Sequence, residues 1–214
     1  MKILLTGATG FVGSEVLRQA LESPSVAKVT CLTRRPLGMA VPKLQELVLP
    51  DFTDYSQVAP ELDADACIWG LGVSQFAVSK EEYVRITHDY AMEAARAMFT
   101  AAPAMRFCFV SGAGADREEH ATALNRNIKG RTEGDLAQLG PNVFIFRPAF
   151  IRPAHAGQRR PLITRAWSLI ADVVDRFTDD FSVGCRQLAR CLLDVAQHGA
   201  EARVFENRII KHWP

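Results

Sequence analysis

The residues best suited to chemistry near the start of the chain are three glycines at three-residue spacing. Gly7, Gly10 and Gly13 follow an apolar run at residues 3–5 and precede residues 14–23, whose composition and apolar spacing predict a helix. Glycine allows a tight turn, lets backbone approach a pyrophosphate and lets a helix pack closely on a strand. The N–H groups and the positive dipole end of that helix would face the phosphates. The pattern predicts a nucleotide-type cofactor bound on this turn.

Arg34 and Arg35 end the next predicted strand, residues 26–33. They stand about twenty residues past the glycine turn, where a site that prefers NAD keeps an Asp or Glu for the ribose 2′-hydroxyl. Positions 28–35 hold no acidic residue. A guanidinium binds a 2′-phosphate by charge-assisted hydrogen bonds, whereas a carboxylate would repel it. The sequence therefore predicts NADP(H), with NAD(H) less favoured. One phosphate needs only one close arginine, so the other arginine can be a solvated loop residue.

Two further segments are expected at the same edge of the sheet, because each follows a predicted strand. One offers a place for an adenine, although its aromatic residue suits the core equally well. The other has two glycines where backbone can approach the dinucleotide. These candidates are Asp51, Phe52, Gly70, Leu71 and Gly72.

A later group of polar residues could act on a substrate. Ser111 directly follows residues 106–110, a strongly apolar predicted strand, and so reaches the edge where ligands bind in open α/β sheets. Asn125 and Lys129 are four positions apart in a predicted helix, residues 121–139, and share one of its faces. We therefore treat Ser111, Asn125 and Lys129 as site candidates.

The elements that must position these residues alternate along the chain. Strands are predicted at residues 3–5, 26–33, 44–49, 64–70, 106–110, 143–147 and 203–210. Helices are predicted at residues 14–23, 80–100, 121–139, 162–177 and 183–198. This alternation predicts an α/β class, a doubly wound parallel sheet (Rossmann fold) in a single domain of residues 1–214.

Residues 148–214 are expected to contribute a small C-terminal lobe on the substrate side. The apolar stripe of residues 162–177 is interpreted as the core of that lobe, with a homodimer face or a substrate lid as alternatives. Tyr83 and Tyr90 share the apolar stripe of residues 80–100 and are interpreted as packing residues rather than catalytic ones.

Composition limits the partners. The 214 residues carry a net charge of +1, with 48% hydrophobic and 23% charged residues, which argues against disorder and against a nucleic-acid footprint. The sequence shows no signal peptide and no apolar run long enough to span a membrane, so a cytoplasmic protein is expected. Five cysteines without a CxxC pair predict buried thiols, and five histidines without ligand spacing predict no metal.

Taken together, these motifs make the chain similar to the short-chain dehydrogenase/reductase superfamily. More narrowly, it resembles small atypical NADP-binding members related to the Tat-interacting oxidoreductase-like proteins. The matching motifs are Thr6-Gly7-Ala8-Thr9-Gly10-Phe11-Val12-Gly13, Arg34, Tyr83-Val84-Arg85 with Asp89-Tyr90, Phe109-Val110-Ser111, Lys129-Gly130, Phe146-Arg147-Pro148 and Glu206-Asn207. The resemblance implies that Thr6, Thr9, Phe11, Val12, Lys129, Arg147 and Pro148 also bind the cofactor.

The resemblance further implies hydride transfer between a nicotinamide and a carbonyl or alcohol. In the superfamily a Ser holds the oxygen, a Tyr four residues before a Lys moves the proton, and the Lys binds the nicotinamide ribose. Ser111 and Lys129 match, but the tyrosine position is Asn125. A phenol with a pKa near 10 can be tuned toward neutrality, whereas a carboxamide has no proton to exchange in that range. Asn125 therefore cannot be the acid of an ordinary ketone reduction.

Three functions remain open. A reductase could use His120, Asp116, Glu118 or a bound water as the proton relay, His120 having a suitable pKa. A non-redox isomerase or cyclase could use Ser111 and Asn125 to hold a small-molecule substrate. A dinucleotide-dependent regulator could bind a protein partner, and a pocket filled by Trp69 or Trp167 would favour that role. We expect an enzyme more than a regulator.

Overall fold

The computed structural model describes residues 1–154 and 180–214, and these contain a parallel sheet in the strand order β3-β2-β1-β4-β5-β6-β9. Its strands are β1 (Lys2–Thr6), β2 (Lys28–Thr33), β3 (Leu44–Val48), β4 (Ala66–Trp69), β5 (Arg106–Val110), β6 (Val143–Arg147) and β9 (Val204–Glu206). The chain winds outward from β1 to β3, then returns to the other side of β1 and winds outward again from β4. This doubly wound parallel sheet confirms the predicted fold class.

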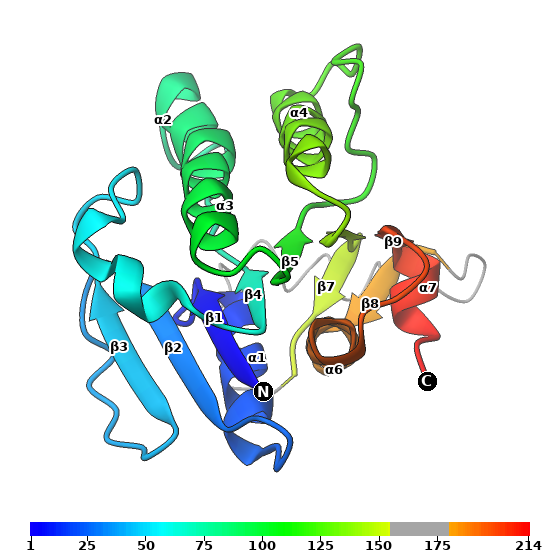
Figure 1. Ribbon diagram of the computed structural model, residues 1–214. Helices are drawn as coiled ribbons and strands as arrows, with labels where there is room; N and C mark the ends of the chain where they lie inside the picture. Colours follow the sequence, from blue (N-terminus) through cyan, green and yellow to red (C-terminus); the bar gives the residue numbers. More distant parts are fainter. Residues whose placement is uncertain (155–179) are drawn as a thin grey trace.

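Helices cover both faces of the sheet (Figure 1). One layer consists of α1 (Phe11–Glu22) and α6 (Cys185–His198), and the other of α3 (Tyr90–Ala101) and α4 (Leu124–Leu139), with the short helix η1 (Ser56–Leu62) beside them. In β1, Ile3 and Leu5 enter the core under α1 and α6, whereas Leu4 enters the core under α3. Side chains of a strand alternate between faces, so a continuous apolar run is what a sheet covered on both sides requires.

The predicted helix at residues 80–100 is interrupted. It consists of α2 (Lys80–Val84), a π-helical segment η2 (Arg85–Asp89) and then α3. Ser79 caps α2, since its Oγ accepts a hydrogen bond of 3.2 Å from the N–H of Glu82. Wide π-type turns within helices are frequent at functional sites.

The end of the chain differs from the prediction. Residues 203–210 are not one strand, because β9 ends at Glu206 and α7 (Asn207–Lys211) follows. Asn207 fixes this change of direction: its side chain accepts from the N–H of Ala149 and donates to the carbonyl of Asp180. The predicted helices at residues 121–139 and 183–198 begin only at Leu124 and Cys185.

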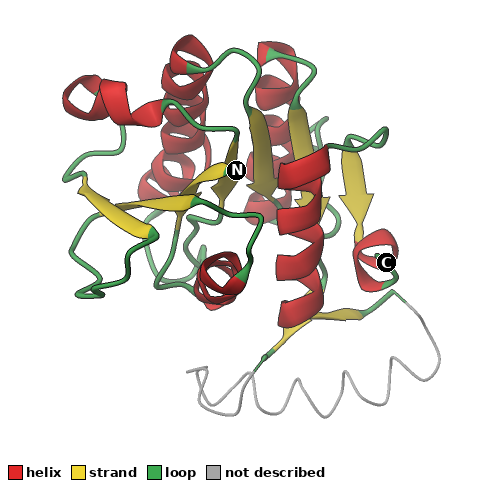
Figure 2. Cartoon of the chain, turned by 60° about the horizontal axis from the view of Figure 1, so that its bottom comes forward, coloured by secondary structure: helices red, strands yellow, loops and turns green. Residues whose placement is uncertain are grey.

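A second, two-stranded parallel sheet pairs β7 (Phe150–Arg152) with β8 (Ser182–Gly184). Figure 2 shows it at the end of α6, apart from the main sheet. By contrast, α6 and β9 belong to the main body. The predicted helix at residues 162–177 lies outside the described residues, so the division at residue 148 stays a prediction.

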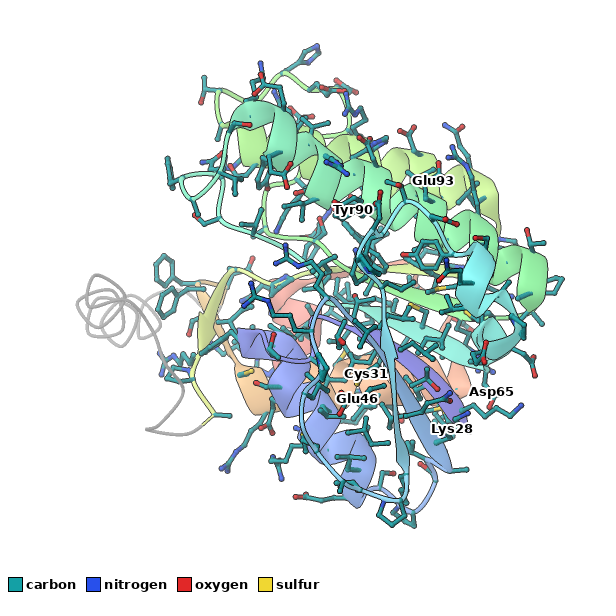
Figure 3. All side chains as sticks on the ribbon, turned by 90° about the vertical axis from the view of Figure 1, so that its left-hand side faces the viewer. Lys28, Cys31, Glu46, Asp65, Tyr90 and Glu93 are labelled. Atoms are coloured by element: carbon teal, nitrogen blue, oxygen red, sulfur yellow. The ribbon has the colours of Figure 1, made fainter. Side chains whose placement is uncertain are left out.

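The described cysteines are buried thiols that form no disulfide. Cys31 lies opposite Glu46 on the neighbouring strand (Figure 3). Burial, with a smaller contribution from the charge of Glu46, raises the pKa of the Cys31 thiol to about 12, which leaves it unreactive at neutral pH. Within the described part of the chain, every helix is too short or too polar to cross a membrane.

Candidate functional site

The glycine turn connects β1 to α1 at the point where the strand order reverses. Gly7 has a φ of +69°, and its carbonyl accepts a hydrogen bond of 2.7 Å from the N–H of Gly10. A Cβ at Gly13 would lie 2.1 Å from the same carbonyl oxygen, so only glycine lets the helix start this close to the strand. The first turn of α1 contains no acidic residue, which leaves its N-terminus suited to an anion.

Thr6 joins this turn to the next strand. Its Oγ1 accepts hydrogen bonds of 3.1 Å from the N–H groups of both Gly70 and Leu71. A Cβ at Gly7 would lie 2.4 Å from the carbonyl oxygen of Gly70. The carboxyl ends of β1 and β4 are thus fixed together at the switch point, the place where open α/β sheets bind ligands.

A cavity of about 450 Å³ opens on one side of this point, and we call it the arginine cavity. It is lined by Gly7, Ala8, Thr9, Leu32, Thr33, Arg34, Arg35, Pro36, Phe52 and Leu71. Both arginine side chains are exposed at its rim. Thr33 is only 8% exposed, and its Oγ1 has no hydrogen-bond partner among the described residues. A buried hydroxyl left unpaired in a cavity wall is costly unless a ligand or water satisfies it.

A second cavity of about 250 Å³ lies on the other side, and we call it the serine cavity. Its walls come from the loop after β4, from α2 and η2, from the end of β5 and from α4 and β7. They are formed by Gly70, Leu71, Gly72, Val73, Ser74, Tyr83, Thr87, Phe109, Val110, Ser111, Lys129 and Ile151. Leu71 lines both cavities, so the two adjoin.

Ser111 is held by a buried carboxylate. Its Oγ lies 2.5 Å from Oε1 of Glu133, whose side chain is fully buried. Arg147 contacts both oxygens of Glu133, with Nε 3.0 Å from Oε1 and Nη2 2.5 Å from Oε2, and Arg117 adds a contact of 3.4 Å. Hydrogen bonding to Glu133 is the main cause that raises the pKa of Arg147 beyond its usual range. Ser111 donates its hydroxyl proton to Glu133, so its Oγ can only accept from a ligand.

Lys129, which belongs to α4, lies beside Ser111. Its Nζ donates a hydrogen bond of 2.7 Å to the carbonyl oxygen of Ser111. Burial lowers the pKa of Lys129 to about 8, although the charge of Glu133 acts in the opposite direction. Its remaining N–H groups can serve a ligand.

Several predicted residues lie elsewhere. Asn125 is not among the residues that line the serine cavity, and its backbone N–H donates to the side chain of Gln75. The His120 side chain is 79% exposed and lies 3.5 Å from Glu118. Asp116 accepts from backbone N–H groups of its own loop. The structure thus separates the three proposed proton relays and Asn125 from the lining of the serine cavity.

The remaining candidates are partly brought together. Phe52 lines the arginine cavity, but Asp51 does not. The Asp51 carboxylate accepts from the N–H and the hydroxyl of Thr53. Pro148 offers only its carbonyl to Ala113, and Arg147 is engaged with Glu133. Trp69 is buried against Phe52 and Phe107 and does not fill the serine cavity. Trp167 lies outside the described residues.

Among the residues that sequence reasoning missed are Thr33 and Tyr83, which line the two cavities, and Glu133, which is buried behind Ser111. Glu133 follows Lys129 by four positions and so shares its helix face, which was an available signal. Thr33 ends β2 at the carboxyl edge of the sheet, which was another. Tyr83 was interpreted as a packing residue, and the structure places it in the wall of the serine cavity.

A doubly wound parallel sheet with a glycine turn at its switch point defines a dinucleotide-binding protein of the Rossmann type. The chain belongs to the NAD(P)H-binding family, which it matches over residues 7–160. Its fold is the NAD(P)-binding fold that the resemblance implied.

The chain is also similar to several curated proteins. The chain is 24% identical over 218 residues to protein HTATIP2 of Rattus norvegicus, covering 98% of the chain and 88% of that protein. It is 28% identical over 198 residues to the mitochondrial protein fmp52 of Aspergillus fumigatus, covering 81% and 83%. The leucinostatins biosynthesis cluster protein T of Purpureocillium lilacinum is 32% identical over 143 residues, which is 65% of the chain but only 52% of that protein. The chain therefore spans about half the length of this last relative.

Solved structures share the fold. The Bordetella bronchiseptica enzyme WbmG, in complex with NAD, superposes with a TM-score of 0.71 at 15% identity, over 96% of this chain and 71% of that one. A short chain dehydrogenase from Burkholderia cenocepacia, in complex with NADP, superposes with a TM-score of 0.68 at 18% identity, over 95% of this chain and 86% of that one. The fold is thus found with either dinucleotide.

Proposed function

We propose that this chain is an NADP(H)-dependent reductase of a small carbonyl substrate. The dinucleotide would extend from the arginine cavity, across the start of α1, to the serine cavity. One observation carries the proposal: the two cavities adjoin at Leu71, directly over the glycine turn, and one is cationic while the other holds Ser111 and Lys129.

The residues present fit such a cofactor. The Thr33 hydroxyl and the Arg34 guanidinium suit a phosphorylated ribose, and the open N-terminus of α1 suits the pyrophosphate. Phe52 gives the arginine cavity an aromatic wall. Lys129 can hold the second ribose with the N–H groups that the Ser111 carbonyl leaves free.

A reduced nicotinamide supplies a hydride when it is bound. The chain's own contribution is to orient the substrate oxygen in the serine cavity and to exclude water from it. Val73, Phe109 and Ile151 give that cavity apolar walls, which strengthens each hydrogen bond made inside it.

Calorimetric titration with NADPH and NADH tests the cofactor. We expect NADPH to bind at least tenfold more tightly, since a charge-assisted hydrogen bond is worth roughly 1.5–3 kcal/mol. Arg34→Ala should lower the affinity for NADPH to about the affinity for NADH and leave the affinity for NADH unchanged. Arg96→Ala is the matched control, because this arginine lies on α3, pairs with Glu93 and lines neither cavity. Equal binding of both dinucleotides would refute NADP(H) preference, and binding of neither would refute the proposal itself.

Oxidation of NADPH by a panel of small aldehydes and ketones tests the reaction. NADPH binding without turnover of any carbonyl would favour the alternative role, a dinucleotide-dependent regulator. Buried thiols without disulfides suit a reducing compartment, so we propose the cytoplasm as the location. The name of the Aspergillus relative places that protein in mitochondria, and fractionation that finds this chain there would contradict the proposal.

A further inference from the structure

The serine cavity needs a donor for a substrate oxygen, and its two expected donors are not available. Asn125 is outside the lining, and Ser111 gives its proton to Glu133. Among the lining residues, the side chains that can still donate are those of Ser74, Tyr83, Thr87 and Lys129. Ser74 belongs to the loop and accepts from the N–H of Phe76.

Tyr83 is unusual among the buried aromatic residues. It is only 2% exposed, yet it belongs to neither of the two apolar core clusters of the described residues. Its place is instead in the wall of the serine cavity, with Ser111 and Lys129. A buried phenol usually finds a hydrogen-bond partner, and a phenol at a cavity wall is able to find it in a ligand.

The helix around Tyr83 supports this reading. Thr87 lies one turn later and lines the same cavity. The π-helical segment begins at Arg85, between the two residues, at a point where the sequence pattern predicts an ordinary α-helix. Two hydroxyl groups of this helix are therefore in the wall of the serine cavity.

We propose that Tyr83 is the catalytic residue that hydrogen-bonds the reacting oxygen and exchanges a proton with it, a role that the superfamily gives to a tyrosine at the position of Asn125. This inference rests on the proposed function. In the reduction, the carbonyl carbon gains a hydride from the reduced dinucleotide, and the oxygen gains the phenolic proton. The C=O double bond becomes a C–O single bond with one new C–H and one new O–H bond. The Tyr83 phenolate then recovers a proton from water.

The protonation state fits a donor. Burial raises the pKa of Tyr83, and the nearby Thr87 hydroxyl only partly offsets this, so the phenol keeps its proton at neutral pH. The Thr87 hydroxyl is a far weaker acid. Lys129 is the rival donor, and one of its N–H groups already bonds the Ser111 carbonyl. Comparing Tyr83→Phe with Lys129→Met distinguishes a Tyr83 donor from a Lys129 donor.

Tyr83→Phe tests the role, with Tyr90→Phe as the matched control. Tyr90 lies on α3 (Figure 3), contacts Phe52 and Arg85, and lines neither cavity. We expect Tyr83→Phe to lower kcat for carbonyl reduction about 100-fold or more, as loss of a general acid does. The dissociation constant of NADPH should stay within twofold in both variants, and Tyr90→Phe should keep its kcat.

A second readout does not need turnover. The chain has three tyrosines, so protein labelled with ¹³C at the tyrosine ζ carbon gives three signals, and Tyr83→Phe identifies one of them. In the presence of NADP⁺, a small unreactive amide that mimics the carbonyl should shift the Tyr83 signal and leave the other two in place. The same amide should bind Tyr83→Phe several-fold more weakly.

The outcomes separate the two proposals. If NADPH binds and carbonyls are reduced, but Tyr83→Phe keeps its kcat within twofold while Lys129→Met loses it, Tyr83 is not the donor and the proposed function stands. An amide that binds without moving the Tyr83 signal also overturns the inference. If the wild-type protein binds neither dinucleotide, the proposed function fails first, and this inference fails with it.

Discussion

Replacing Gly13 by alanine tests whether the glycine turn is dictated by contact rather than by local flexibility. A Cβ at this position would lie 2.1 Å from the Gly7 carbonyl oxygen and 2.6 Å from its carbon. Contacts below 3.0 Å essentially do not occur for real Cβ atoms, so the backbone must move by about 0.9 Å. The displaced carbonyl is the acceptor of the 2.7 Å hydrogen bond from Gly10, so the whole turn has to change.

Overpacking of this kind costs about 1–3 kcal/mol, and the loss of one backbone hydrogen bond adds about 1 kcal/mol. We therefore expect Gly13→Ala to lower the free energy of unfolding by about 2–4 kcal/mol and the midpoint of thermal unfolding by roughly 4–16 °C. Because the same N–H groups face the proposed pyrophosphate, NADPH affinity should fall at least tenfold. Urea denaturation and calorimetry measure the two effects.

Gly134→Ala is the matched control. Gly134 lies inside α4, and a Cβ there would have no neighbour within 4 Å among the described residues. Alanine in a helix interior is favoured over glycine by about 0.5–1 kcal/mol, so this variant should be more stable than the wild type. If Gly13→Ala stays within 0.5 kcal/mol of the wild type in unfolding and binds NADPH normally, the steric account of the turn is wrong.

Three further predictions follow from the site. Glu133→Gln should destabilise the protein by about 3 kcal/mol because it leaves the Arg147 guanidinium half-paired, whereas Glu206→Gln, at a half-exposed partner, should cost under about 1 kcal/mol; equal losses in urea denaturation would contradict this. Since burial lowers the Lys129 pKa to about 8 from 10.5, the unfolded chain binds more protons between these values, so stability should rise with pH across this window by up to about 3 kcal/mol. Lys129→Met should flatten that rise, and an unchanged slope would refute the desolvation argument. Thr33→Val should leave the free protein as stable or more stable, because the hydroxyl is unpaired among the described residues, but should weaken NADPH binding about fivefold in calorimetry; normal binding would exclude a role for that hydroxyl.

The sequence was sufficient for the fold class and for the place of the glycine turn. Both depend on local features: apolar runs such as residues 3–5 that can be buried on both faces, and glycines at positions where a side chain cannot fit. Alternation of strands and helices then leaves few topologies, because parallel connections are right-handed and short. Element ends were predicted less well, as at residues 203–210, where Asn207 bonds to backbone far away in the sequence.

Only the tertiary structure decided what the site residues can do. Ser111 was found from its position after a strand, but its loss of a free proton follows from Glu133, which α4 brings to it, and from Arg147, which β6 brings to that carboxylate. The helical pattern placed Tyr83 on an apolar stripe; Ala91, Ala94 and Met98 of that stripe enter the core, whereas Tyr83 and Thr87 line the serine cavity. Periodicity tells which residues share a face. It does not tell what that face meets, because burial, hydrogen-bond partners and pKa are set by groups from distant parts of the chain.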